Sequence, residues 1–182
     1  MRFAYADPPY LGQARRHYGP NAHEVNHPIL IATLRRRFPD GWALSCSSPS
    51  LQTLLPLCPP DVRVLAWVKP FASFKPGVGV AYAWEPVIVR GGRRRTRTQP
   101  TIRDWMAANP TRRTGIAGAK PETFCRWLFS VLNAQPGDEL VDLFPGTGIL
   151  TRTWQLVQAE LATAPQPPDP TVEAQGGGTD GQ

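Results

Sequence analysis

The segment Asp7-Pro8-Pro9-Tyr10 places an ionisable carboxylate, two prolines and an aromatic ring directly after the apolar run at residues 1–6. The run predicts a buried strand, and the prolines end it because proline cannot donate to a strand ladder. Asp7 is then expected at the carboxyl end of that strand. The segment either only terminates the strand or also holds a reacting group.

A second segment with chemical potential is LVDLFPGTG at residues 140–148, in which Asp142 precedes two glycines. Gly146 and Gly148 allow backbone amides to approach a ligand, and a helix that starts after them offers unpaired N–H groups. The pattern is typical of a cradle for a nucleotide-like cofactor. The alternative is a tight strand-to-helix turn that binds nothing.

The elements around these segments alternate between strand and helix. Apolar runs predict strands near residues 1–6, 41–47, 61–70, 80–90 and 138–142, and helical spacing predicts helices at 27–38, 48–58, 121–134 and after Gly148. Pro86 favours an edge position or a bulge for its strand, and residues 101–109 predict a short helix. The alternation predicts an α/β fold with a parallel sheet.

In a doubly wound sheet, ligands bind beyond the carboxyl ends of the strands, where the strand order reverses. Asp7 and Asp142 both follow predicted strands, although they are far apart in the sequence. We therefore expect the two carboxylates to face one pocket.

Five segments, taken in order, resemble a known family: DPPY at 7–10, WVKP at 67–70, AWEPVIV at 83–89, KPETFCRWLF at 120–129 and DLFPGTG at 142–148. Together they resemble the permuted amino-methyltransferases, which use S-adenosylmethionine to methylate exocyclic nitrogens of DNA bases. The N6-adenine branch is the nearest match, with its phage-type DNA methylases and the related adenosine methyltransferases of RNA. The resemblance implies a Rossmann-like, doubly wound and circularly permuted fold, shortened here to about five strands with the cofactor strand at an edge.

The resemblance also implies how the DPPY segment acts. The lone pair of an exocyclic amino nitrogen is delocalised into the ring, so the site must offer acceptors to both of its hydrogens. The Asp7 carboxylate and the Pro8 carbonyl are the implied acceptors, with Pro9 keeping that carbonyl outside regular structure. Tyr10 is implied to stack on a base flipped out of the duplex.

The cofactor pocket implied by the resemblance lies in two segments. Its residues are Asp142, Phe144, Pro145, Gly146, Thr147 and Gly148, joined by Lys120 and Pro121 near the methionine end. Phe144 has the alternative of being a core residue. Lys69 and Glu85 occupy motif positions of the family, and their roles stay open.

The formal net charge of +6 favours a polyanionic partner, and residues 162–182 contain no lysine or arginine. Contact with DNA phosphates is predicted for Arg15, Arg16, Arg93, Arg94, Arg95 and Arg97. The alternative for the arginine run is a solvated loop. We expect one methyltransferase-like domain at residues 1–161, with the basic loop 91–119 contacting the target, and a disordered tail at 162–182.

The sequence predicts no metal site, because three isolated cysteines and His17, His23 and His27 lack the spacing of zinc ligands. Neither a secretory signal nor a membrane-spanning apolar run is apparent, so a cytoplasmic protein is expected.

The predicted function is methyl transfer from S-adenosylmethionine to the N6 amino group of adenine in DNA. The match departs from the family after Gly148, where no further strand is visible before the tail. One alternative is therefore a degenerate fold that only binds nucleic acid, and another is a partner or a second copy that completes the cofactor side. Methylation of another amino group, in cytosine, RNA or protein glutamine, also stays open.

Overall fold

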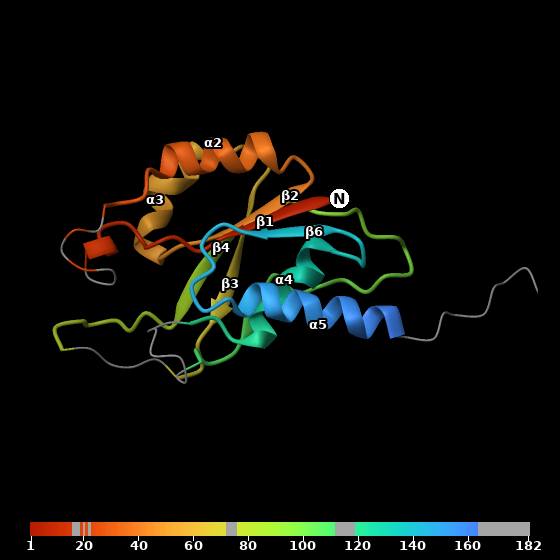
Figure 1. Ribbon diagram of the computed structural model, residues 1–182. Coiled ribbons are helices and arrows are strands. Elements are labelled where there is room, and N and C mark those ends of the chain that lie inside the picture. Colours follow the sequence, from red (N-terminus) through yellow and green to blue (C-terminus); the bar gives the residue numbers. More distant parts are fainter. Residues whose placement is uncertain (16–18, 20, 22, 72–75, 112–118, 164–182) are drawn as a thin grey trace, which may run out of the picture.

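A six-stranded sheet with the order β5-β3-β4-β2-β1-β6 forms the centre of the computed structural model (Figure 1). The structure describes residues 1–15, 19, 21, 23–71, 76–111 and 119–163. The strands are β1 (Arg2–Ala6), β2 (Gly41–Ser45), β3 (Arg63–Val68), β4 (Trp84–Gly91), β5 (Trp105–Ala107) and β6 (Glu139–Asp142). The predicted tail lies almost entirely outside the described residues.

Strand β4 alone runs against the direction of the other five strands. β1 pairs in parallel with β2 and β6, and β3 with β5, whereas β4 pairs antiparallel with both β2 and β3. The predicted strand–helix alternation is confirmed for β1 to β3. The fully parallel sheet is wrong, because no helical crossover separates β3 from β4 among the described residues.

The predicted edge position of Pro86 is also wrong, because its strand lies inside the sheet between β3 and β2. Ser45 pairs with Val87, so Pro86 lies opposite Cys46, one residue beyond the end of β2. The Pro86 carbonyl accepts from the Cys46 amide at 3.1 Å. The missing proline donor therefore falls at the end of the ladder between β2 and β4, where it interrupts no pair of that ladder.

The short helix predicted at residues 101–109 is a strand instead. Trp105, Met106 and Ala107 pair in parallel with β3, which has a free edge at this position. Tertiary pairing overrides the weak helical preference of this stretch. The extra strand raises the expected five strands to six.

Two layers of helices enclose the sheet. On one face lie α2 (His27–Arg37) and α3 (Leu51–Leu54), the latter flanked by the 3₁₀ turns Ser48–Ser50 and Leu55–Leu57. On the other face lie α4 (Glu122–Leu132) and α5 (Ile149–Thr163) (Figure 1). Each layer packs its apolar face on the sheet in a separate core cluster. None of the helices in the described ranges is long and apolar enough to cross a membrane.

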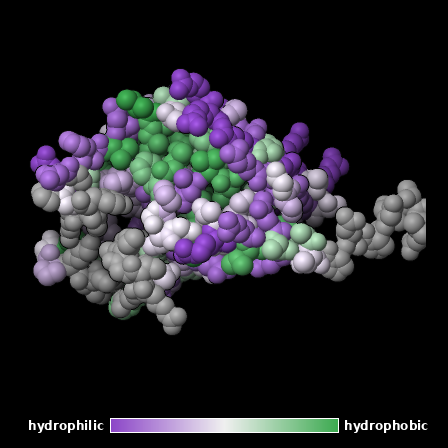
Figure 2. Space-filling model, viewed as in Figure 1, coloured by the Kyte–Doolittle hydropathy of each residue, from purple (hydrophilic) through white to green (hydrophobic). Residues whose placement is uncertain are grey.

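Strand β6 forms one edge of the sheet, as expected for the strand that precedes the glycine loop. In the described part of the chain, no strand follows α5. Figure 2 shows hydrophobic side chains gathered between α2 and α5, over this edge. The edge is therefore apolar as well as unpaired.

Candidate active site

The two segments singled out in the sequence begin side by side. β1 and β6 pair in parallel with Tyr5 opposite Asp142, and the Leu143 amide donates to the Tyr5 carbonyl at 2.9 Å. The carboxyl ends of parallel strands meet at one edge of a sheet. The structure thus brings the DPPY segment and the glycine loop together.

The closest partner of Asp7 is Lys120, a residue that the sequence assigns to the cofactor segment. The Lys120 Nζ donates to the two Asp7 carboxylate oxygens at 2.9 and 2.8 Å. Lys120 is positioned by the start of α4, which follows at Glu122, and its side chain is 6% exposed. The ammonium group is therefore a buried counter-ion of Asp7.

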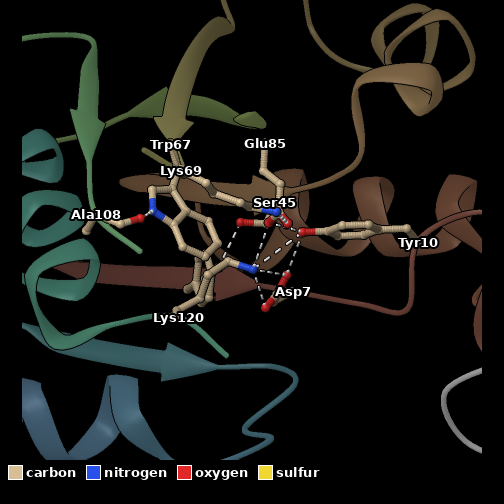
Figure 3. A network of polar contacts seen from close by, with 9 residues as sticks. Asp7, Tyr10, Ser45, Trp67, Lys69, Glu85, Ala108 and Lys120 are labelled. Atoms are coloured by element: carbon tan, nitrogen blue, oxygen red, sulfur yellow. Dashed lines mark hydrogen bonds and ion pairs between the residues drawn. The ribbon is translucent and has the colours of Figure 1, made fainter. Parts of the chain in front are cut away.

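Glu85 and Lys69 complete a cluster of four charges around this pair (Figure 3). Glu85 lies on β4, and Lys69 follows the end of β3, which pairs with β4. Lys69 forms an ion pair with Glu85, and Lys120 Nζ lies 3.3 Å from the second Glu85 oxygen. Two lysines balance two carboxylates, so the cluster carries no net charge when all four are ionised.

The Tyr10 hydroxyl points into this cluster (Figure 3). It donates to Glu85 Oε2 at 2.6 Å and lies 3.5 Å from Asp7 Oδ1. Lys120 Nζ lies 3.4 Å from the same hydroxyl and 5.8 Å from the ring centroid. The DPPY loop is thereby anchored at both Asp7 and Tyr10.

Aromatic rings form the inner wall of the cluster. Lys120 Nζ lies 5.1 Å from the centroid of Trp67 and 5.8 Å from that of Phe124. Trp67 Nε1 donates to the Ala108 carbonyl at 2.8 Å, which fixes the indole. The rings exclude water and attract the ammonium group through their faces. Sequence reasoning did not single out Trp67, although it begins the WVKP motif.

The cluster shifts the pKa values of its members. Burial raises the pKa of Asp7 despite Lys120 and raises that of Tyr10 well above its ordinary value, with Asp7 and Glu85 adding to the latter shift. Burial opposes charge on Glu85 as well, but Lys120 and Lys69 outweigh it and lower the pKa of Glu85. Burial also opposes charge on Lys120, and Asp7 and Glu85 reverse this to raise its pKa. Tyr10 therefore remains a neutral donor, whereas Glu85 remains ionised.

The glycine loop has the geometry expected for close backbone approach. Gly146 and Gly148 adopt φ values of +47° and +70°, a region that other residues rarely occupy. Asp142 Oδ1 accepts from the Phe144 amide at 3.2 Å, and burial raises the pKa of Asp142. Phe144 also packs partly against the α2-side core, so its core alternative is compatible with its place.

The remaining cofactor candidates fall beside the loop or at the start of α4. Pro145 is exposed and Thr147 is half-buried in the loop turn, and Pro121 caps α4. The Gly148 amide donates to the Pro145 carbonyl, and Arg152 Nη1 donates to the Thr147 carbonyl at 2.8 Å. These two hydrogen bonds therefore stabilise the loop turn.

The arginine run does not lie beside Asp7. It follows Gly91, which pairs with Gly41 at the start of β2, whereas Asp7 follows the end of β1. Arg93 donates two hydrogen bonds to Asp138, at 2.7 and 2.9 Å, and Arg95 donates to the Ser130 and Pro100 carbonyls. The two arginines thus have structural partners at the opposite end of the sheet.

The other arginines predicted to contact DNA have different positions. Arg94 and Arg97 are exposed in the same run, and no side-chain partner of either is found in the described ranges. Arg15 is exposed just after the DPPY segment, and Arg16 lies outside the described residues. Of the predicted contacts that the structure describes, Arg15 is the one close in sequence to Asp7. No group of metal-ligating side chains occurs in the described part of the chain.

Comparison with known proteins supports the fold. No family model and no curated protein matches this chain. The crystal structure of an M1.HpyAVI-SAM complex has a TM-score of 0.55 and 14% sequence identity, over 87% of this chain and 79% of that one. A crystal structure of M1.HpyAVI has a TM-score of 0.51 and 14% identity, over 87% and 76% of the two chains. The chain thus shares the α/β fold of M1.HpyAVI.

Proposed function

We propose that this chain transfers a methyl group from S-adenosylmethionine to the N6 amino group of adenine in DNA. The observation that carries the proposal is the pairing of β1 with β6, which sets Asp7 beside the loop that begins at Asp142. The similarity to a fold solved as a SAM complex supports the choice of cofactor. The resemblance of the motif series to N6-adenine methylases supports the choice of substrate.

The glycine loop fits the cofactor by its donors and acceptors. The backbone N–H groups of Gly146 and Thr147 have no acceptor among the described residues, and only the Phe144 amide donates to Asp142. These amides would hold an anionic group such as a carboxylate, and Asp142 would accept from an amino or hydroxyl group. S-adenosylmethionine supplies an electrophilic methyl group when it is bound.

The DPPY segment fits an exocyclic amino group. The Pro8 carbonyl accepts no hydrogen bond from the described residues, and each Asp7 oxygen has capacity beyond its bond to Lys120. Both acceptors are therefore open to the two hydrogens of an amino nitrogen. Lys120 restrains the Asp7 carboxylate, and such positioning contributes to the rate.

Tyr10 would contribute a face on which the target base stacks. Its hydroxyl is anchored on Glu85, so the ring has a fixed orientation at the site. An aromatic ring held in this way loses little further entropy when a base stacks on it.

The test uses purified protein, labelled S-adenosylmethionine, and DNA, RNA or protein as acceptor. We expect label in DNA, at the N6 position of adenine. Label in RNA, in cytosine or in protein would support methyl transfer but would show that adenine in DNA is not the substrate.

A second candidate is a nucleic-acid-binding protein without transferase activity. It is favoured by the edge position of β6, which leaves the strand beside the glycine loop unpaired on one side. In this case DNA binds but S-adenosylmethionine does not.

A partner or a second copy that covers the β6 edge would restore cofactor binding. Sedimentation of the active species would reveal such a complex.

A further inference from the structure

We propose that a hollow between α2 and β4 binds the phosphate backbone of nucleic acid, away from the candidate active site. Its volume is about 380 Å³, and its lining residues are Ala32, Arg35, Arg36 and Arg90. Three of the four are arginines, whose planar guanidinium groups match phosphate oxygens. None of them belongs to the arginine run at residues 93–97.

The fold itself brings the three guanidinium groups together. Arg35 and Arg36 lie in the last turn of α2, where basic residues are also favoured by the helix dipole. Arg90 pairs with Trp42 across β4 and β2, and Trp42 belongs to the core cluster under α2. The Arg90 side chain therefore leaves the sheet on the α2 side.

Positive charge exceeds negative charge in this hollow. Arg90 uses its Nε to donate to the Asp61 carboxylate at 2.9 and 3.1 Å, and its two Nη groups have no partner in the described ranges. The side chains of Arg35 and Arg36 are likewise without a hydrogen-bonding acceptor there. Asp61 stays ionised, because its bond to Arg90 lowers its pKa. Three cations against one anion leave the hollow suited to a further anion.

The positively charged surface extends beyond the hollow and is larger than one phosphate group. Arg37 is exposed in the same helical turn, and Arg94 is exposed just beyond β4 at the same end of the sheet. Figure 2 shows strongly hydrophilic side chains gathered over the C-terminal end of α2. An extended polyanion fits this surface better than a single small anion does.

The length of α2 is comparable with a short run of nucleotides. The 11 residues of α2 span roughly 16 Å, which is about five steps of 3.4 Å along one strand. The choice of nucleic acid as the polyanion rests on the proposed function, whereas the anion site does not.

The experiment measures the binding of a fluorescent 20-base-pair duplex by anisotropy at several salt concentrations, without S-adenosylmethionine. The test variant is Arg35→Gln with Arg36→Gln. The matched control is Arg63→Gln with Arg103→Gln, which removes the same charge beside β3 and β5. We expect the test variant to bind at least about tenfold more weakly and its salt slope to fall by about two, while the control changes little.

Equal losses in the test and control variants would overturn the proposal, because they would reflect net charge alone. Ala32→Glu adds a negative charge to the hollow without removing an arginine, and it must also weaken binding. Displacement of the duplex by polyglutamate as efficiently as by unlabelled DNA would overturn nucleic acid as the partner. The assay is repeated in the Asp7→Ala background, so loss of methyl transfer does not affect its outcome.

Discussion

The Lys120 ammonium group lies within 2.9 Å of both carboxylate oxygens of Asp7, although 113 positions separate the two residues. This ion pair joins the DPPY loop after β1 to the start of α4. It also joins the candidate catalytic segment to a segment that the sequence assigns to the cofactor. Lys120 thus restrains the Asp7 carboxylate from the start of α4.

Lys120→Met is expected to destabilise the fold strongly. The substitution leaves Asp7 and Glu85 as neighbouring carboxylates without their shared counter-ion, in a site where Lys120 is 6% exposed. Breaking a buried ion pair in this way costs about 3 kcal/mol. Urea unfolding followed by circular dichroism measures the loss.

The control for this change is Arg126→Met, which removes exposed pairs with Glu122 and Glu160. Exposed ion pairs contribute little, so the urea midpoint should hardly move. Equal midpoints for the two variants would show that the cluster around Lys120 does not stabilise the fold.

Tyr10→Phe distinguishes the hydrogen bond that anchors the Tyr10 ring from the stacking of that ring on the target base. The variant loses the 2.6 Å hydrogen bond to Glu85 but keeps the aromatic face. We expect a loss of about 1 to 2 kcal/mol in stability and a moderate loss of activity. Tyr10→Ala removes the face as well, so its KM for DNA should rise far above that of Tyr10→Phe. Equal KM values in both variants would exclude stacking by Tyr10.

Much of the fold could be predicted from apolar periodicity and from prolines that mark element ends. The strand β1, the helix α2 and the amphipathic α4 were predicted close to their observed bounds. The interior place of β4 was not predicted, because its central position depends on pairing with β2 and β3 rather than on its own residues. The same holds for β5, whose three residues pair only because β3 offers a free edge.

The candidate site was predictable to the extent that strand ends mark it. Asp7 and Asp142 both follow strands, and a parallel sheet brings such ends together. The link from Lys120 to Asp7 was not predictable, because it depends on how α4 packs over the sheet. Lys69 and Glu85 occupied motif positions without a role. The antiparallel pairing of β3 with β4 sets Glu85 opposite Trp67, two residues before Lys69, so that the two charged side chains can pair.

Glu85 should contribute a loss of stability in acid. Burial opposes ionisation of Glu85, but Lys120 and Lys69 prevail and lower its pKa in the folded state. The contribution is therefore present above the ordinary glutamate pKa of about 4.3 and is lost as the pH falls through the lower folded value. Urea titrations from pH 7 to pH 3 measure this.

Glu85→Gln should show a smaller loss of stability over that pH range, because the glutamine side chain does not take up a proton there. A pH dependence identical to that of the unaltered chain would exclude Glu85 as a contributor.

Gly148→Ala should impair the glycine loop. The residue has φ +70°, and an added Cβ would lie 3.3 Å from Arg152 Nη1. The backbone strain costs about 1 kcal/mol. Gly137→Ala has a similar φ of +85° with open space around it and lies before β6, so it controls for the strain. Calorimetry should show weaker S-adenosylmethionine binding for Gly148→Ala alone, and equal binding by the two variants would argue against a cofactor role for this loop.

The most direct measurement is the product formed on DNA by the purified chain and by Asp7→Ala. Each protein is incubated with S-adenosylmethionine and duplex DNA, and the digested nucleosides are analysed by mass spectrometry. We predict N6-methyldeoxyadenosine with the unaltered chain and none with Asp7→Ala at equal folded concentration. The same yield of methylated base from both proteins would contradict the proposed role of Asp7. No methylated base from an unaltered chain that binds both ligands would contradict the proposed methyl transfer.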